Sequence, residues 1–379
     1  MPDVDLLIRA GRIVCTRSGI DGPGAVAIRS GRIVATGPQV GGAGTQTIDL
    51  PDAVLLPGLI DFHAHPARSG SKYGVDPDVE FLPRGVTTVL SQGDAGADNW
   101  PEYRAGTIDA SNSRVRLALN LSRFGEPPGG ACFRVTNCID RVACASAVAD
   151  GDELIWGISV NLSRESCALD PRWVLQHGLA IATECGKPLL VGMRNPSDWP
   201  IREQLALLRS GDVVTYLFRD GEWSIIGKDG RVLPEVRDAR ERGILFDACH
   251  GLQSFSFRAA EAAIADGFLP DTISTDQYAR HVGSNPPHHL PRTMSKLLAA
   301  GMTELDVFAR VGAHPAALLG LSHDIGSLEP GSCADLTALV QRPSAAPLVD
   351  CRDDSRPGLC WESVLVVRAG TIVAPQAIK

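Results

Sequence analysis

The stretch LPGLIDFHAHP, residues 56–66, is an apolar run that ends in two histidines, and the fold of the chain can be worked out from it. Side chains in a β-strand alternate between faces, so His63 and His65 point to the same face while Ala64 points to the other. Two convergent imidazoles suit one metal ion. An isolated His-x-His pair also fits one core histidine and one loop histidine, so the rest of the chain has to decide.

Eight apolar runs rich in β-branched residues lie between residues 53 and 276. They are AVLLPGLIDF (53–62), GVTTVLSQ (85–92), RLALNLS (116–122), LIWGISVNL (154–162), KPLLVGM (187–193), DVVTYLF (212–218), GILFDAC (243–249) and DTISTD (271–276). The segments between them are long enough for helices, and residues 199–209 and 257–268 have helical periodicity. We therefore predict an α/β protein with a (β/α)8 TIM barrel over residues 53–324, whose catalytic groups lie at the carboxyl ends of the strands.

Both ends of the chain differ from this interior, because they alternate short β-like runs with turn residues. Examples are DLLIRAGRIVC near the start and ESVLVVRAGTIVAP near the end. Such runs are typical of hairpins. We predict that residues 1–52 and 325–379 together form one small β-sandwich domain.

Composition favours small-molecule chemistry. The 379 residues include 36 Lys and Arg against 44 Asp and Glu, a formal net charge of −8, and no basic cluster that would bind nucleic acid or an anionic membrane. The start of the chain lacks a signal-peptide layout, and no apolar run reaches the length of a membrane span, so we expect a cytoplasmic protein. Ten cysteines without Cys-x-x-Cys pairs indicate buried thiols rather than disulfides. The oligomeric state stays open, a homo-oligomer included.

Asp276 closes the eighth run, as His63 and His65 close the first. The first and eighth strands of a closed barrel are neighbours, so the three side chains can converge despite more than two hundred intervening residues. Two histidines and one carboxylate form a suitable catalytic zinc site, because three protein ligands leave one position open. Taken alone, Asp276 would equally fit a helix N-cap or a turn.

Several motifs resemble the amidohydrolase superfamily over essentially the full chain. LPGLIDFHAHP matches its strand-one His-x-His, PDTISTD (270–276) its strand-eight Asp, and IGSLEPGSCADLTAL (325–339) its closing β segment. Residues 85–100, 246–257, 290–302 and 312–321 resemble the amidohydrolase/deacetylase branch, which is related to dihydroorotases and D-aminoacylases. The resemblance implies metal-assisted hydrolysis of an acyl-amide, cyclic-amide or acyl-ester bond, with Asp276 moving the proton of the attacking water.

The chain departs from the two-metal members of this superfamily at three places. Ser159 stands where they carry a carboxylated lysine, and Gly192 and Tyr216 stand where they carry histidines. The ligands of a second metal are therefore missing together, while those of the first are retained. We expect one divalent ion per chain, zinc in the first instance, with iron or manganese as alternatives.

Further residues receive roles from the same resemblance. Asp94 in SQGDAG stands near a ligating cysteine of D-aminoacylases, so it is a candidate replacement ligand or general acid/base, or a turn residue. His250 and Tyr216 are candidates for oxyanion or substrate binding, and Arg194 for pairing a substrate carboxylate. Cys249, next to His250, is interpreted as a buried structural thiol rather than a nucleophile.

Two rival functions remain open at this level. A one-metal site could serve a cyclase or lyase, and ligand loss could mark a metal-free binding protein. The retention of His63, His65 and Asp276 favours a mononuclear metallohydrolase acting on a small molecule.

Overall fold

The interior of the chain forms a barrel of parallel strands. The computed structural model describes residues 4–41, 44–127, 131–344 and 346–373. Seven strands pair in chain order, each parallel to the next: β5 (Leu59–Ala64), β6 (Val86–Gln92), β7 (Arg114–Asn120), β8 (Ile155–Asn161), β9 (Leu189–Gly192), β10 (Val213–Val214) and β11 (Leu245–Phe246). The first seven predicted runs each overlap one of these strands, although β10 and β11 are only two residues long.

The eighth run closes the barrel without forming a regular strand. On one side Ala248 N donates to Thr272 O, and His250 N donates to Ser274 O, at 3.0 Å each. On the other side Asp276 N donates to His63 O at 2.7 Å, beside β5. The first and eighth runs are therefore neighbours in the structure, as predicted.

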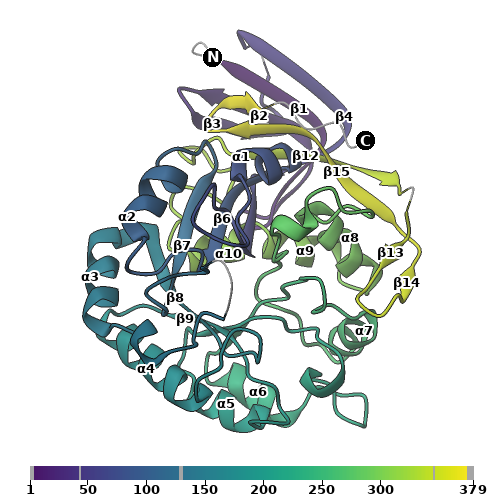
Figure 1. The fold of residues 1–379 in the computed structure, drawn as a ribbon. Coiled ribbons are helices and arrows are strands. Elements are labelled where there is room, and N and C mark those ends of the chain that lie inside the picture. Colours follow the sequence, from purple (N-terminus) through teal and green to yellow (C-terminus); the bar gives the residue numbers. More distant parts are fainter. Residues whose placement is uncertain (1–3, 42–43, 128–130, 345, 374–379) are drawn as a thin grey trace.

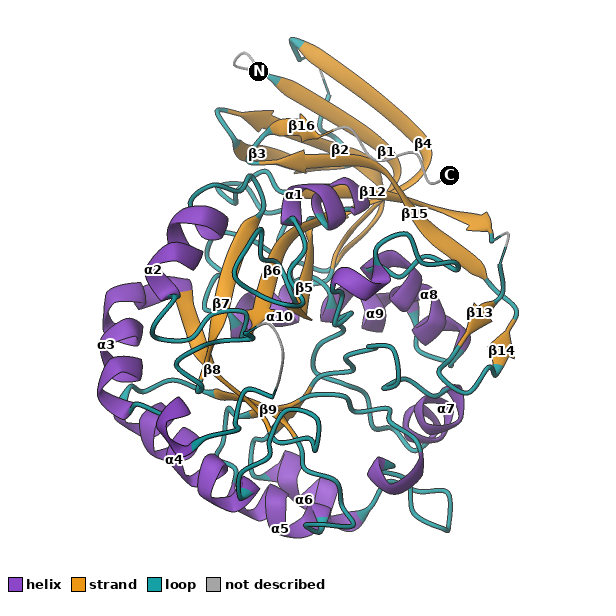
Figure 2. Cartoon of the chain, in the orientation of Figure 1, coloured by secondary structure: helices purple, strands orange, loops and turns teal. Residues whose placement is uncertain are grey.

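Helices surround the barrel, mostly one after each strand (Figure 2). They are α1 (Pro77–Glu80), α2 (Trp100–Tyr103), α3 (Arg141–Gly151), α4 (Pro171–Glu184), α5 (Ile201–Leu207), α6 (Pro234–Glu241), α7 (Phe257–Ala265), α8 (Leu290–Ala299), α9 (Glu304–Arg310) and α10 (Ala313–Leu318). Among the described residues, no helix combines the length and the apolar character needed to cross a bilayer.

Strands from both ends of the chain form a second sheet beside the barrel (Figure 1). Its seven strands lie in the order β16-β15-β12-β4-β1-β2-β3. Their bounds are β1 (Leu6–Cys15), β2 (Ile20–Arg29), β3 (Arg32–Gly37), β4 (Gln46–Pro57), β12 (Leu336–Pro343), β15 (Leu359–Arg368) and β16 (Thr371–Val373), and β13 (Leu348–Val349) pairs with β14 (Ser355–Arg356) as a hairpin. The predicted fold class, a TIM barrel with a small β-domain drawn from both ends, is confirmed.

The chain passes from one sheet to the other at Gly58, inside the first predicted run. Residues 54–57 pair with β12 in the terminal sheet, and β5 starts the barrel at Leu59. The predicted division after residue 52 therefore falls inside β4. Gly58 permits a close approach, because a Cβ there would lie 2.2 Å from the Thr87 hydroxyl.

A buried ionic cluster joins the terminal sheet to the amino-terminal edge of the barrel. Arg114, the first residue of β7, donates to Asp335 at 2.6 Å, and Arg368 at the end of β15 donates to the same carboxylate at 3.0 Å. Asp335 is 3% exposed. Burial opposes its ionisation, but Arg368 and Arg114 outweigh that effect and hold the pKa of Asp335 below its usual value.

We expect Asp335→Asn to lower the free energy of unfolding by about 3 kcal/mol, because two arginines lose their buried partner. Since the folded pKa of Asp335 is depressed, its contribution is present above its unfolded pKa and is lost as the pH falls through the folded pKa. Urea unfolding at neutral and acidic pH measures both effects. Glu184→Gln, which breaks an exposed pair with Arg141, is the control and should cost less than about 1 kcal/mol.

Candidate active site

The structure brings His63, His65 and Asp276 together at the carboxyl edge of the barrel. His63 Nε2 lies 3.6 Å and His65 Nε2 lies 3.3 Å from Asp276 Oδ1. Ligand atoms placed tetrahedrally around zinc at ordinary N/O bond lengths are about 3.3–3.6 Å apart. Each histidine nitrogen therefore lies at ligand spacing from Asp276, whereas the three residues whose ligand atoms all lie within 4.8 Å of one another are His63, Cys249 and Asp276.

His65 is held in place by Asp94 through its other ring nitrogen. His65 Nδ1 lies 3.0 Å from Asp94 Oδ1, and Asp94 also accepts hydrogen bonds of 2.6 Å from Ser71 Oγ and Ser91 Oγ. Because the carboxylate can only accept, Nδ1 carries a proton, and Nε2 is directed at Asp276.

His63 is oriented by a second polar chain. Thr215 Oγ1 lies 2.9 Å from His63 Nδ1 and donates to Asp247 Oδ2 at 3.1 Å. Ser274 and Thr272 also donate to Asp247, whose carboxylate is fully buried. This arrangement puts the proton on His63 Nδ1. His63 Nε2 is then a buried acceptor that receives no hydrogen bond from any described residue.

Two imidazole Nε2 atoms and a carboxylate thus face one another in a buried space. Burial opposes charge on His65, but Asp94 and Asp276 outweigh it and raise its pKa to about 10. Burial also opposes ionisation of Asp276, yet the two histidines lower the pKa of its carboxyl well below the usual value. The site therefore attracts positive charge, which a divalent cation can supply.

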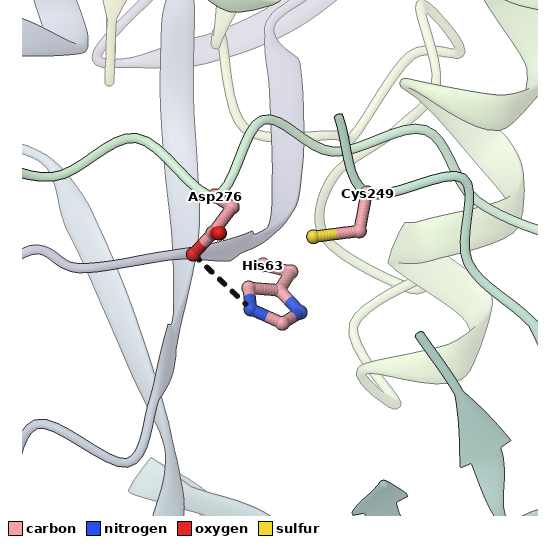
Figure 3. A group of neighbouring side chains, drawn as sticks. All are labelled: His63, Cys249 and Asp276. Carbon is pink, nitrogen blue, oxygen red and sulfur yellow. Dashed lines mark ion pairs between the residues drawn. The ribbon is translucent and has the colours of Figure 1, made fainter. Parts of the chain in front are cut away.

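Three successive strand ends of the barrel share a left-handed backbone conformation at a non-glycine residue. The φ angles are 65° at Tyr216, 27° at Cys249 and 53° at Asp276. Such residues cost about 1–3 kcal/mol each and are typical of functional sites. Figure 3 shows the thiol of Cys249 turned toward His63 and Asp276, and one ligand atom from each of the three lies within 4.8 Å of the others.

Gly251 is required by the position of the Asp276 carboxylate. Its φ is 51°, and a Cβ at this position would lie 2.9 Å from Asp276 Oδ2. Tyr216 Oη donates to the same oxygen at 3.4 Å. Asp276 is therefore confined on both sides.

A cavity opens in front of this group. His65, Asp276 and Tyr216 form part of its wall. The remaining lining residues are Tyr73, Gln92, Glu126, Asn161, Ser166 and Tyr278. Three of the four tyrosines of the chain thus face one cavity.

Three residues are placed differently from the roles expected of them. Asp94 lies across the His65 ring from Asp276 and contacts His65 Nδ1. His250 has both nitrogens engaged, by Gly251 O and Lys296 Nζ at 2.7 Å each. The guanidinium of Arg194 is bound by Asp198 Oδ2 at 2.7 Å and by a backbone carbonyl, away from the cavity.

Several residues of the site were missed in the sequence. Thr215 and Asp247 anchor His63, and Glu126 lines the cavity. Asp247 could have been found from the sequence, because a charged residue inside an apolar strand run needs a buried partner. No sequence pattern marks Glu126, because it lies in the loop that follows β7.

Comparison with known proteins agrees with this fold. Residues 254–355 match the model of the amidohydrolase family. Deacetylase Atu3266 of Agrobacterium fabrum is 34% identical over 303 residues, which cover 78% of this chain and 72% of that protein. The structure of an adenine deaminase superimposes with a TM-score of 0.89 at 28% identity, covering 98% of this chain and 100% of that one. A dihydroorotase structure gives a TM-score of 0.87, also at 28% identity, covering 97% and 99%.

The fold, the buried polar site and these relatives define an enzyme, a barrel hydrolase that acts on C–N bonds. The chain belongs to the amidohydrolase family, whose members are typically dependent on divalent metals.

We expect Asp94→Asn to weaken divalent-metal binding by about tenfold to a hundredfold while the fold is retained. The amide can still contact His65, but it no longer fixes the Nδ1–H tautomer with a negative charge. Competition with a chromogenic chelator measures the affinity. Asp98→Asn, in the same loop but paired with the exposed Arg123, is the control and should bind metal as the unaltered protein does. Equal affinities for the two variants would contradict a positioning role for Asp94.

Proposed function

We propose that the protein is a mononuclear metallohydrolase that cleaves an amide, cyclic-amide or acyl-ester bond of a small molecule. The observation that carries this proposal is the position of His63 Nε2 and His65 Nε2, 3.6 and 3.3 Å from Asp276 Oδ1. Each of these two distances fits a pair of ligands to one zinc ion. Iron or manganese would also accept two imidazoles and a carboxylate.

The proposal of a single ion is supported by what occupies the place of a second one. Gln92 Nε2 donates to Ser159 Oγ at 2.7 Å, so that hydroxyl is already engaged. A Cβ at Gly192 would lie 2.8 Å from Asn161 Oδ1, so Asn161 fills the space that a longer side chain would need. Neutral amides and hydroxyls therefore replace the ligands of a second metal.

Each residue of the site would have its own role in the reaction. An ion held by His63, His65 and Asp276 would polarise the scissile carbonyl and lower the pKa of a water. Asp276 Oδ2, which is free of the histidines, would accept the proton of that water and pass it to the leaving nitrogen or oxygen. Tyr216 Oη, beside Asp276, would donate a hydrogen bond to the oxyanion.

Metal analysis tests the stoichiometry. We expect about one divalent ion per chain in protein purified without chelator. Because a reacting water needs an open position, the cobalt-loaded protein should lack a sulfur-to-cobalt charge-transfer band, and Cys249→Ser should leave its spectrum unchanged. Two ions per chain, or a charge-transfer band that Cys249→Ser removes, would contradict this assignment.

Removing a ligand should abolish turnover. His63→Ala and Asp276→Asn should each lower kcat/KM for an acetyl amide or ester by at least about a thousandfold, with the melting temperature little changed, because these groups lie at the mouth of an apolar barrel. His323→Ala alters an exposed histidine and is the control. Near-normal activity of either ligand variant would remove the metal site from the mechanism.

A further inference from the structure

Uncharged polar groups form most of the cavity wall outside the proposed metal site. They belong to Tyr73, Gln92, Asn161, Ser166, Tyr216 and Tyr278. The one further charged group of the wall is the carboxylate of Glu126, and no lysine or arginine is among the described lining residues. The cavity therefore differs from one built to hold a substrate carboxylate, which requires a cationic or strongly donating partner.

Two arginines that follow neighbouring strands of the barrel are engaged elsewhere. The guanidinium of Arg194 is bound by Asp198. Arg219 donates to Ser254 Oγ at 3.1 Å and stacks behind the Tyr216 ring, with its guanidinium carbon 4.2 Å from the ring centroid. A substrate anion would therefore have to displace an existing partner of either side chain.

Glu126 is fixed in position by its backbone. Its N–H donates to Asp94 O at 3.5 Å, and its carbonyl accepts from Lys72 N at 3.0 Å. Gly125 has a φ of 67°, and a Cβ there would lie 2.6 Å from Asp94 O, so the turn is pressed against the Asp94 loop. The Glu126 carboxylate is thus placed by the same loop that positions His65.

The Glu126 side chain is buried at 2% exposure, and its carboxylate pairs with one cation. The ammonium of Lys72 lies 3.1 Å from Oε2 and forms an ion pair with it. Burial raises the pKa of Glu126 despite this partner. A carboxylate can accept several hydrogen bonds, so a ligand that donates to Glu126 adds a charge-assisted bond in a buried space.

We propose that Glu126 determines specificity by accepting a hydrogen bond from an amine, amide N–H or hydroxyl of the substrate, at the end away from the scissile bond. This role of Glu126 rests on the proposed hydrolytic function. It assigns the substrate to neutral or cationic acyl compounds that carry such a donor. Compounds with a carboxylate at that end are disfavoured, because they would place two negative groups together in a buried space.

Three acetyl amides of matched length test the proposal: N-acetylethylenediamine, N-acetylethanolamine and N-acetyl-β-alanine. For the unaltered protein we expect kcat/KM for the amine and the alcohol to exceed that for the carboxylate by about tenfold or more, the effect of one hydrogen bond to a charged group. Glu126→Gln should lower kcat/KM for the amine by about tenfold and raise it for the carboxylate. Glu165→Gln, at an exposed carboxylate outside the cavity, should leave the ratios unchanged.

A preference of the unaltered protein for the carboxylate would overturn the proposal, and so would unchanged ratios in Glu126→Gln. If Glu126→Gln does not fold, the double variant Lys72→Gln/Glu126→Gln removes both charges of the pair. The ratios of kcat/KM among the three compounds, measured in the double variant, then test the proposal. If none of the three compounds is hydrolysed, the proposed hydrolysis of small acetyl amides fails. Calorimetric binding of the intact compounds to the unaltered protein and to Glu126→Gln then tests Glu126 separately, and a loss of amine binding in the variant would support its role.

Discussion

The closure of the barrel between β5 and residues 275–277 is the constraint on which the site depends. Asp61, buried in β5, accepts hydrogen bonds from Thr275 N at 3.0 Å and Thr275 Oγ1 at 2.6 Å. The neighbouring backbone bonds join Asp276 to His63 and Gln277 to His65. Because a shift of one residue would turn every side chain to the other face, this register brings the two imidazoles and the carboxylate to one point.

Each imidazole then depends on a buried carboxylate behind it. His65 is backed directly by Asp94, whereas His63 reaches Asp247 through Thr215. These networks explain how a barrel with an apolar core tolerates several acidic groups, since buried carboxylates are stabilised when hydrogen-bond donors surround them. They also fix both rings with Nε2 directed at Asp276, so the site is preorganised for a cation.

Three candidate residues have partners that their positions in the sequence do not indicate. Asp94, His250 and Arg194 all lie near the ends of the strands on which they were predicted, but each is engaged by another part of the protein: His65, Lys296 and Asp198 respectively. The position of a residue on its strand determines where its Cα atom lies. The partner that it finds depends on loops whose conformations have no periodic signal.

The sequence by itself determined the barrel, the small β-domain drawn from both ends, the His-x-His pair and the Asp of the eighth run. These follow from local alternation of apolar residues and from the rule that the first and eighth strands are neighbours. Tertiary structure alone decided the tautomers of His63 and His65, the approach of Cys249 and the burial of Glu126 beside Lys72. Those features depend on contacts between residues far apart in the chain, and their energies are set by burial and hydrogen bonding that no local pattern encodes.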